Sequence, residues 1–102
     1  VNAKVGEKIR FRFIGSNNAF IHPMHIHGGP FKIVETDGNP VPVAAQIEKD
    51  TINVAPGERY DVIWTARNKG KWLLHCHIAH HATNDNVEVR GAGGLTMLIN
   101  VT

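Results

Sequence analysis

Polar and apolar residues alternate along several short stretches of this chain. Lys8 to Ile14, with the sequence Lys-Ile-Arg-Phe-Arg-Phe-Ile, alternates residue by residue, which is typical of a strand with one buried face. Phe31 to Val34 is a second short apolar run, and the segment that follows it, Asp37 to Pro40, is a strong turn signal. Thr51 to Val54 is a third run and is followed by the turn sequence Ala-Pro-Gly-Glu. The pattern predicts strands rather than helices.

The second half of the chain continues in the same way. Arg59 to Thr65 places three large apolar side chains on one face, and Trp72 to His77 and Leu95 to Val101 are predicted as the last two strands. Short strands at this spacing predict an all-β domain, a Greek-key β-sandwich or barrel. Two stretches do not follow the strand pattern. We expect a helical turn within Val43 to Lys49 and a long loop from His80 to Gly94.

The composition is that of one ordinary globular domain. At 102 residues the chain can build a single hydrophobic core, and its hydrophobic fraction of 42% is typical of globular proteins. The formal net charge of +2 is too small to indicate a nucleic acid or an anionic membrane as partner. The single cysteine excludes an internal disulfide. The chain begins with Val1 rather than Met, which we interpret as a processed product or an excerpt from a longer protein.

Candidate chemistry is concentrated in two short segments. All seven histidines and the only cysteine lie in His-Pro-Met-His-Ile-His-Gly, from His22 to Gly28, and in Trp-Leu-Leu-His-Cys-His-Ile-Ala-His-His, from Trp72 to His81. Imidazole nitrogen and thiolate sulfur are the ligands that transition metals such as copper and zinc select. The clustering therefore predicts a metal site. An exposed histidine-rich surface is a weaker interpretation, as is a set of buried histidines, which would be costly without partners.

Strand geometry divides these residues between two faces. Side chains alternate along a strand, so His75 and His77 project to one side and Cys76 to the other. The same rule places His25 and His27 on one face. Residues two apart lie about 6.6 Å apart along a strand, so each histidine pair can reach two neighbouring ions. Cys76 then binds a different ion, and its strand connects two metal centres through covalent bonds.

The identity of the metal follows from the ligand set. Structural zinc sites usually use cysteines two to four residues apart, whereas here cysteine is scarce and the histidines are too many for one ion. A site of two histidines and one cysteine with a weak or absent fourth ligand is typical of blue copper. Two other hypotheses stay open: a blue-copper electron carrier without catalytic activity, and a domain that stores zinc or copper. The carrier would leave four of the histidines without a role.

The two motifs resemble those of the C-terminal cupredoxin domain of multicopper oxidases, the group that contains the laccases. The resemblance runs from about Gly6 to Val101 and includes Val-Ala-Pro-Gly-Glu-Arg-Tyr-Asp-Val, from Val54 to Val62. It implies a single cupredoxin domain over residues 1–102, with copper ligands assigned by their position in the motifs. The type 1 (blue) copper would bind His22, Cys76 and His81, the type 2 copper His25, and the type 3 pair His27, His75 and His77.

The resemblance also implies a reaction. A small reducing substrate gives electrons to the type 1 copper, and Cys76, His75 and His77 carry them to a trinuclear copper cluster that reduces O2 to water. The cluster needs eight histidines in this family, of which this chain offers only His25, His27, His75 and His77. Another cupredoxin domain, on the same polypeptide or on another subunit, has to supply the others, so we expect the isolated domain to be inactive as an oxidase. The family also implies a periplasmic or extracellular location.

Three residues compete for the axial position of the type 1 copper. Many family members have Met, Leu or Phe five residues after the last type 1 histidine, and this position is Asn86 here. If the loop is an insertion, Gly94 and Leu95 align with the usual Gly-Met or Gly-Leu pair, so we favour Leu95. Met97 is on the same strand face and is the second candidate, and Asn86 is the third. A leucine leaves the copper nearly three-coordinate and raises its potential, whereas a thioether lowers it. His80 has no ligand role in the family pattern.

Overall fold

Short strands make up nearly all of the regular structure. The computed structural model describes residues 1–16, 19–78 and 94–102. In these residues the elements are β1 (Asn2–Ala3), β2 (Lys8–Ile14), β3 (His22–Ile26), β4 (Phe31–Thr36), β5 (Asn39–Pro40), the 3-10 turn η1 (Val43–Ala45), β6 (Glu48–Lys49), β7 (Thr51–Val54), β8 (Arg59–Thr65), β9 (Gly70–Cys76) and β10 (Thr96–Val101).

The strands predicted from the pattern are confirmed, with small shifts at their ends. Lys8–Ile14, Thr51–Val54 and Arg59–Thr65 have the predicted bounds. The run beginning at Phe31 continues to Thr36, because its last residues still pair with β8. The two final strands begin and end within two residues of the prediction.

Two segments differ from the prediction. Asp37 and Gly38 form the expected turn, with φ of 50° and 81°, and positive φ at both central residues is characteristic of tight hairpin turns. Asn39 and Pro40, however, are not part of the turn but form β5 against β4. The expected helical turn is confirmed as η1, but the same segment ends in β6, which also pairs with β4. Both short strands lie at the edge of the sheet, where proline is tolerated.

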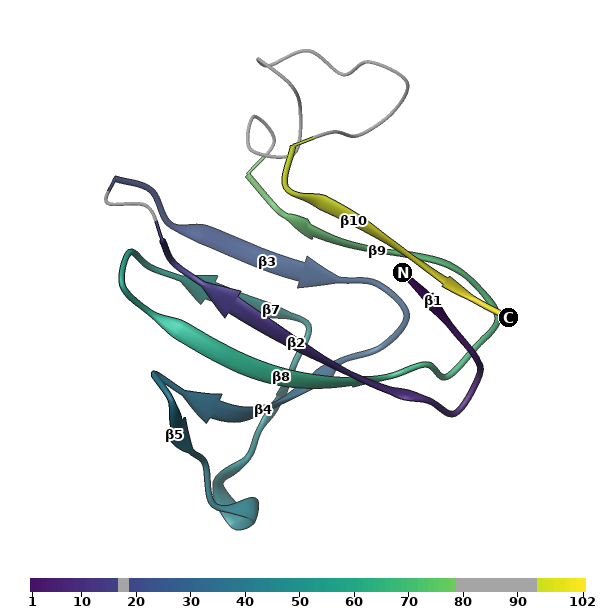
Figure 1. The fold of residues 1–102 in the computed structure, drawn as a ribbon, viewed down its shortest axis with the longest axis horizontal. Coiled ribbons are helices and arrows are strands. Elements are labelled where there is room, and N and C mark those ends of the chain that lie inside the picture. The colour runs from purple at the N-terminus through teal and green to yellow at the C-terminus, as the bar shows by residue number, and fades with distance from the viewer. Residues whose placement is uncertain (17–18, 79–93) are drawn as a thin grey trace.

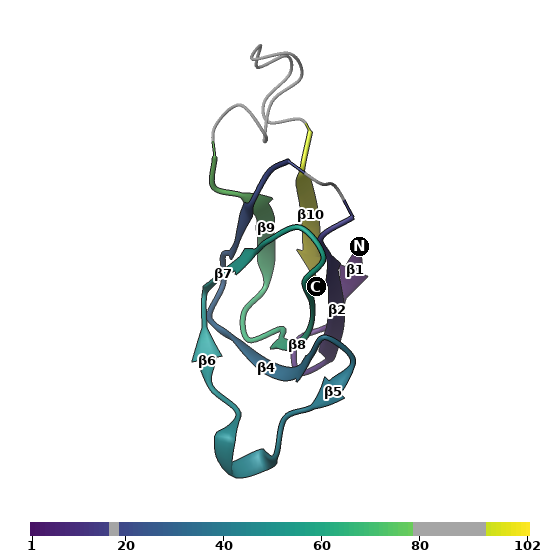
Figure 2. The ribbon, with the colours of Figure 1, turned by 90° about the vertical axis from the view of Figure 1, so that its left-hand side faces the viewer.

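The strands form two sheets that enclose one core (Figures 1 and 2). One sheet has the order β1-β10-β9-β3-β7, and the other has the order β2-β8-β4-β5, with β6 also pairing β4. The β1–β10 pair is parallel, and the other pairs are antiparallel. No helix within the described residues is long and apolar enough to cross a membrane.

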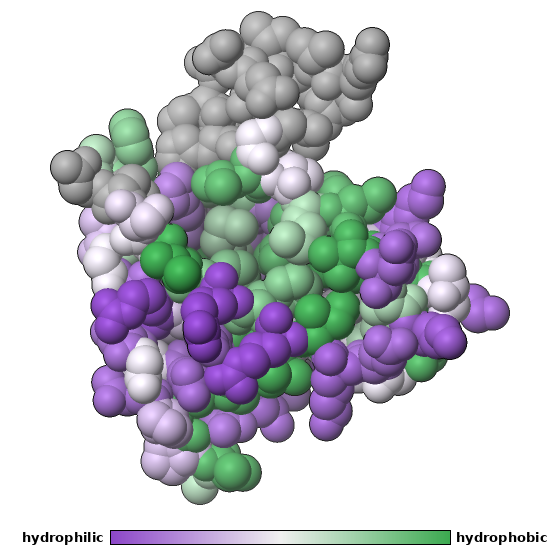
Figure 3. Space-filling view, viewed as in Figure 1, coloured by the Kyte–Doolittle hydropathy of each residue, from purple (hydrophilic) through white to green (hydrophobic). Residues whose placement is uncertain are grey.

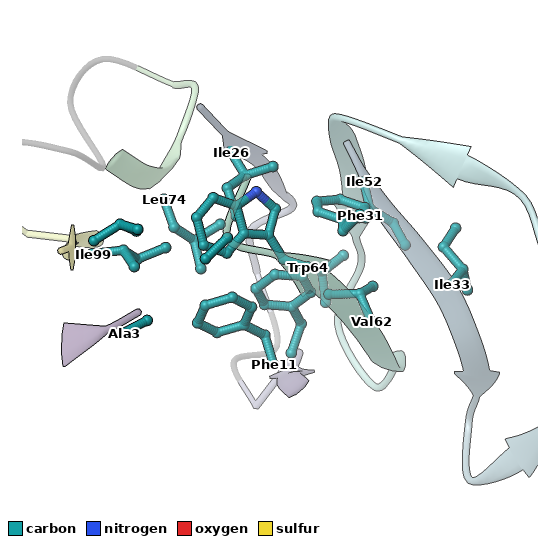
Figure 4. Packing of buried hydrophobic residues seen from close by; sticks show 14 residues of the cluster. Ala3, Phe11, Ile26, Phe31, Ile33, Ile52, Val62, Trp64, Leu74 and Ile99 are labelled. Atoms are coloured by element: carbon teal, nitrogen blue, oxygen red, sulfur yellow. The ribbon is translucent and has the colours of Figure 1, made fainter. Parts of the chain in front are cut away.

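Large apolar side chains from both sheets fill the interior. Trp64 lies in the middle of the cluster in Figure 4, and it is fully buried together with Phe31 and Ile26. Its indole N–H donates to the Gly29 carbonyl at 3.1 Å, so its one polar atom has a partner. Burial of each such side chain stabilises the fold by roughly 1.5–3 kcal/mol. The core thereby fixes β3, which carries Ile26, to β8, which carries Trp64.

Asp61 on β8 is a buried carboxylate held by two arginines of the neighbouring strand. It is 3% exposed, and Arg12 donates to its two oxygens at 2.9 and 3.1 Å while Arg10 donates at 2.8 Å. The hydrogen bonds from Arg12, followed by those from Arg10, hold the pKa of Asp61 below its usual value, against the opposing effect of burial. A lowered pKa stabilises the fold above the unfolded-state pKa near 3.9, and this stabilisation is lost as the pH falls through the folded-state pKa.

We predict that Asp61→Asn lowers the free energy of unfolding at neutral pH by about 1.5–3 kcal/mol, because it removes charge-assisted hydrogen bonds. The variant should also lose part of the dependence of stability on pH below about 4. Denaturant unfolding at several pH values measures both effects. Glu48→Gln, which changes an exposed carboxylate, is the control. Identical pH profiles for Asp61→Asn and the native protein would contradict the assignment.

At position 28, in the turn after β3, both the backbone conformation and the neighbouring side chains require a glycine. Its φ is +82°, and a Cβ placed there would lie 2.8 Å from the Trp72 ring and 3.1 Å from the Trp64 ring. Gly38 has a φ of +81° but nothing within 4 Å of such a Cβ. The two glycines therefore have the same backbone requirement, and only Gly28 has the steric one.

We predict that Gly38→Ala costs about 1 kcal/mol of unfolding free energy, the cost of a left-handed backbone alone. Gly28→Ala should cost a further 1–3 kcal/mol or so, because two tryptophan rings have to move. Thermal or denaturant unfolding of the two variants gives the difference directly. Equal destabilisation by the two substitutions would show that the close approach of Gly28 to Trp72 and Trp64 is unimportant.

Candidate metal centre

Strands β3 and β9 bring the two histidine segments together. They pair in antiparallel fashion, with Met24 opposite Cys76 and His25 opposite His75. Directly after Cys76, the N–H of His77 donates to the Pro23 carbonyl of β3 and so extends this ladder. Opposite residues of an antiparallel pair point to the same face of the sheet. Cys76 therefore points toward the interior, and His25 and His75 point away from it.

Four histidines form a cluster of rings on the outer face of this sheet. We call His25, His27, His75 and His77 the imidazole cluster. Neighbouring ring centroids lie between 5.1 and 5.8 Å apart. Nε2 of His27 and Nε2 of His75 are 3.3 Å apart. Transition-metal bonds to imidazole are about 2.0 Å long, so these two nitrogens can reach the same ion.

The other ring nitrogens of two cluster members are held by the protein. Nδ1 of His25 lies 2.9 Å from the Asp50 carbonyl and 2.9 Å from Oγ1 of Thr51, which donates to the Asp50 carboxylate. Nδ1 of His75 lies 3.1 Å from the Cys76 carbonyl. A carbonyl only accepts, so each Nδ1 carries the proton and each Nε2 has a lone pair for a ligand role. Such contacts orient histidine ligands in metal sites.

His27 is held in the neutral form that binds metal. Burial lowers its pKa most, and the nearby charges of His25, His75 and His77 lower it further. Protonated rings at these distances would repel one another, whereas neutral rings present lone pairs. The lowered pKa of His27 therefore leaves its lone pair available to a metal ion.

Cys76 and His22 form a second group on the interior side. Cys76 is fully buried, and its Sγ lies 3.7 Å from Nδ1 of His22. Burial raises the pKa of the Cys76 thiol, and a backbone hydrogen bond from Ile78 opposes part of that shift. A thiolate at this position therefore needs a cation beside it. Metal bonds of about 2.0 Å to nitrogen and about 2.3 Å to sulfur allow both atoms to bind one ion.

The residues present fit copper at both places, although the described residues alone do not complete a ligand set at either. A thiolate beside an imidazole suits the soft ligand preference of copper, and imidazoles suit copper in general. Within the described ranges, however, no group of three His, Cys, Asp or Glu side chains is placed to hold one ion. The predicted ligand His81 lies outside the described residues, as do His80 and Asn86.

Leu95 lies closest to the cysteine among the described axial candidates. Its carbonyl accepts the Cys76 N–H at 3.0 Å, and Leu95 lines a hollow of about 190 Å³ together with His22 and Met24. Met97 shares the same face but lies opposite Leu74, one step farther along the strand pair. The geometry therefore favours Leu95 over Met97 as the nearer neighbour.

Sequence reasoning missed the residues that hold His25. Asp50 and Thr51 lie at the start of β7, and Thr51 is opposite His25 in the β3–β7 pair. The run beginning at Thr51 was predicted as a strand, but its partner was not. The signal that could have found this contact is a polar, hydrogen-bonding pair at the junction where a buried strand begins.

Comparison with known proteins finds a multicopper oxidase and a copper resistance protein among the relatives of this chain. Residues 1–89 match the family model described as multicopper oxidase. The chain is 38% identical over 63 residues to multicopper oxidase mco of Staphylococcus haemolyticus, which covers 62% of this chain and 14% of that protein. It is 32% identical over 78 residues to copper resistance protein A of Pseudomonas syringae pv. tomato, covering 76% of this chain and 12% of that protein.

A solved structure matches the fold over almost the full chain. Blue Copper Oxidase from Nitrosomonas europaea has a TM-score of 0.86 and 37% identity, covering 99% of this chain and 30% of that one. The predicted all-β, cupredoxin-like architecture is thereby confirmed. The chain spans only 12% to 30% of the length of these relatives. Since the family model matches most of its residues, this chain belongs to the multicopper oxidase family.

Proposed function

We propose that this chain is the C-terminal cupredoxin domain of a laccase-like multicopper oxidase, with residues 1–102 as one domain. One observation carries the proposal: at the end of β9, Cys76 faces the interior while its chain neighbours His75 and His77 face outward into the imidazole cluster. The type 1 copper would be held by His22, Cys76 and His81, the type 2 copper by His25, and the type 3 pair by His27, His75 and His77.

The peptide bonds of β9 give the proposed sites a direct connection. When bound, copper supplies one-electron oxidation of a small reducing substrate at the type 1 site and reduction of O2 to water at the trinuclear cluster. Cys76 is covalently joined to His75 and His77, so only a few bonds separate the interior thiolate from the outer imidazoles. The hydrogen bonds at Nδ1 of His25 and His75 keep those two rings oriented for metal binding.

We propose that a second cupredoxin domain covers the imidazole cluster and supplies the missing histidines. The cluster offers at most two ligands to an ion, which leaves each centre incomplete within the described residues. Leu98, on the same outer face of the sheet, is 45% exposed and gives a covering domain an apolar contact. The relatives are several times longer than this chain, so they have room for such a domain.

The surroundings of His22 suit a reducing substrate. Phe20 and Ile21, directly before it, are exposed apolar residues. We propose that a small donor docks here, beside the type 1 site. A periplasmic or extracellular location is proposed from the family resemblance.

The alternative is a blue-copper electron carrier, which needs only the interior group. The convergence of four imidazoles on the other face favours the oxidase, because a carrier has no use for them. Copper analysis of the full polypeptide separates the two. More than one copper per polypeptide, with a paramagnetic type 2 signal, supports the oxidase, whereas a single blue copper in the full assembly supports the carrier.

We predict that Cys76→Ser in the full polypeptide abolishes both the blue absorption and electron transfer from substrate to O2. The hydroxyl is a far weaker ligand than the thiolate that the type 1 site needs. The type 2 signal should persist, because His25 is on the other face of the sheet. Visible absorption, electron paramagnetic resonance and O2 uptake measure these effects. Retained blue absorption would refute the assignment of Cys76.

We predict that Met97→Leu leaves the visible spectrum and the type 1 potential unchanged, since Leu95 is the nearer neighbour of Cys76. Leu95→Met is the matched variant and should lower the potential by adding a thioether. Redox titration of both variants gives the comparison. A changed potential in Met97→Leu, with none in Leu95→Met, would assign the axial position to Met97.

A further inference from the structure

A hollow on the outer face of the second sheet is lined by cations and by apolar side chains. Its volume is about 370 Å³, and its lining residues come from β2, β4, β6, β8 and the segments beside them. Lys8, Lys32 and Arg67 line it, and Glu48 is the one acidic side chain among the described residues around it. We call this the cationic hollow. Pockets that bind small molecules have volumes in this range.

Alternation along the strands places these side chains on the outer face. Lys8 of β2 lies opposite Thr65 of β8, and Lys32 of β4 lies opposite Ile63 of β8. Trp64, between Ile63 and Thr65, is fully buried, so its two neighbours point outward. Because β2 and β4 flank β8, they are about 9.6 Å apart, which leaves room for a ligand between the two ammonium groups. In Figure 3 hydrophilic side chains gather along the part of the face where β2 runs in Figure 1.

Arg67 is held in place at the hollow by the protein itself. Its Nη1 donates to the Thr65 carbonyl at 3.1 Å. Its side chain also lies against Gly29, where a Cβ would come within 2.6 Å of Nη1, so the absence of a side chain at position 29 leaves space for it. The Gly29 carbonyl in turn accepts the indole N–H of Trp64, which joins this turn to the core. The guanidinium is therefore ordered in advance, which lowers the entropic cost of binding a ligand.

The protein does not balance the positive charge around the hollow. Glu48 lies opposite Lys32 in the β4–β6 pair and offsets one of the three cations. None of the ion pairs in the described part of the chain includes any of these three cations. Arg10, by contrast, is bound to Asp61 and Glu35 and adds nothing to the surplus. Three cations against one carboxylate leave the hollow positive, so it favours an anion.

Apolar side chains form the floor of the hollow. Pro30, Val34 and Ile63 are among its lining residues, and each is half-buried. An inorganic anion would leave this floor in contact with water, whereas a ring would cover it and remove apolar surface from water. A long polyanion would need a continuous track of cations, but the next cations along β2 are already paired with Asp61. The floor and the charges together favour a small organic ligand.

We propose that the cationic hollow binds a small organic anion, a carboxylate carried on an aromatic ring. The Arg67 guanidinium is a planar fork that matches the two oxygens of a carboxylate, and Lys8 and Lys32 add positive charge from β2 and β4. The ring lies on Ile63 and Val34. The proposal does not depend on the copper ligands of β3 and β9, which belong to the other sheet, so either proposal can fail alone.

Calorimetric titration of the full polypeptide with naphthoate tests the charge and the ring together. Binding should weaken as the ionic strength rises, because the cations are exposed. Acetate, which lacks the ring, and naphthylmethanol, which lacks the charge, should bind far more weakly. Lys32→Gln and Arg67→Gln should each weaken naphthoate binding about two- to fivefold, as expected for exposed charge pairs. Glu48→Gln should strengthen it, because it removes the one carboxylate beside the ligand.

Lys49→Gln is the matched control for these variants. Lys49 is the residue after Glu48 but lies opposite Phe31, so it belongs to the other face of the sheet, and its loss should leave the affinity unchanged. Equal affinity for naphthoate in the native protein, Lys32→Gln and Arg67→Gln would overturn the proposal. So would binding of naphthylmethanol as tight as that of naphthoate. Binding of polyglutamate without binding of naphthoate would assign the surface to a macromolecule and would also overturn it.

A methyl spectrum of the full polypeptide tests where the ring lies. The ring current of bound naphthoate should shift the methyl resonances of Ile63, which lies on the floor of the hollow. Ile14, at the other end of β2 and 60% exposed, is the internal control and should keep its resonance position. An unchanged Ile63 signal at saturating naphthoate would place the ligand elsewhere and would overturn the proposal.

Discussion

The imidazole cluster and the pair of Cys76 and His22 both depend on the register between β3 and β9. A shift of one residue would turn every side chain of one strand to the opposite face, so the thiol would point outward and imidazoles would enter the core. Ile26 opposite Leu74 prevents this shift, because both are almost fully buried and sit in the same pair of strands as the ligands. Ordinary core packing therefore places Cys76 inside and His75 outside.

On each face of the sheet, burial shifts the pKa of one candidate ligand away from its charged form. Burial lowers the pKa of His27 and raises the pKa of Cys76, so the protein disfavours an imidazolium on one side and an isolated thiolate on the other. A metal cation resolves both conditions, since it replaces protons on imidazole and stabilises sulfur as thiolate.

Sequence alone could predict the strands and the division of the candidate ligands between two faces, because both follow from alternation along a strand. It could not predict which strands pair, and this is why the contacts of His25 with Asp50 and Thr51 were missed. These contacts depend on the β3–β7 register, which is set by tertiary packing. The pairing of β5 and β6 with β4 was missed for the same reason. The roles of His22 and of His25 versus His27 came from family resemblance, and the Sγ–Nδ1 distance of 3.7 Å now gives the first of these geometric support.

The imidazole cluster and the pair of Cys76 and His22 lie on opposite faces of the same sheet, yet the same strand pairs position both. The Cys76 N–H donates to the Leu95 carbonyl directly before β10, and the His77 N–H donates to the Pro23 carbonyl of β3. Because these two amides belong to consecutive residues, the backbone that sets the direction of the thiol also sets the direction of the neighbouring imidazole. A distortion of either strand pair would therefore disturb both groups at once.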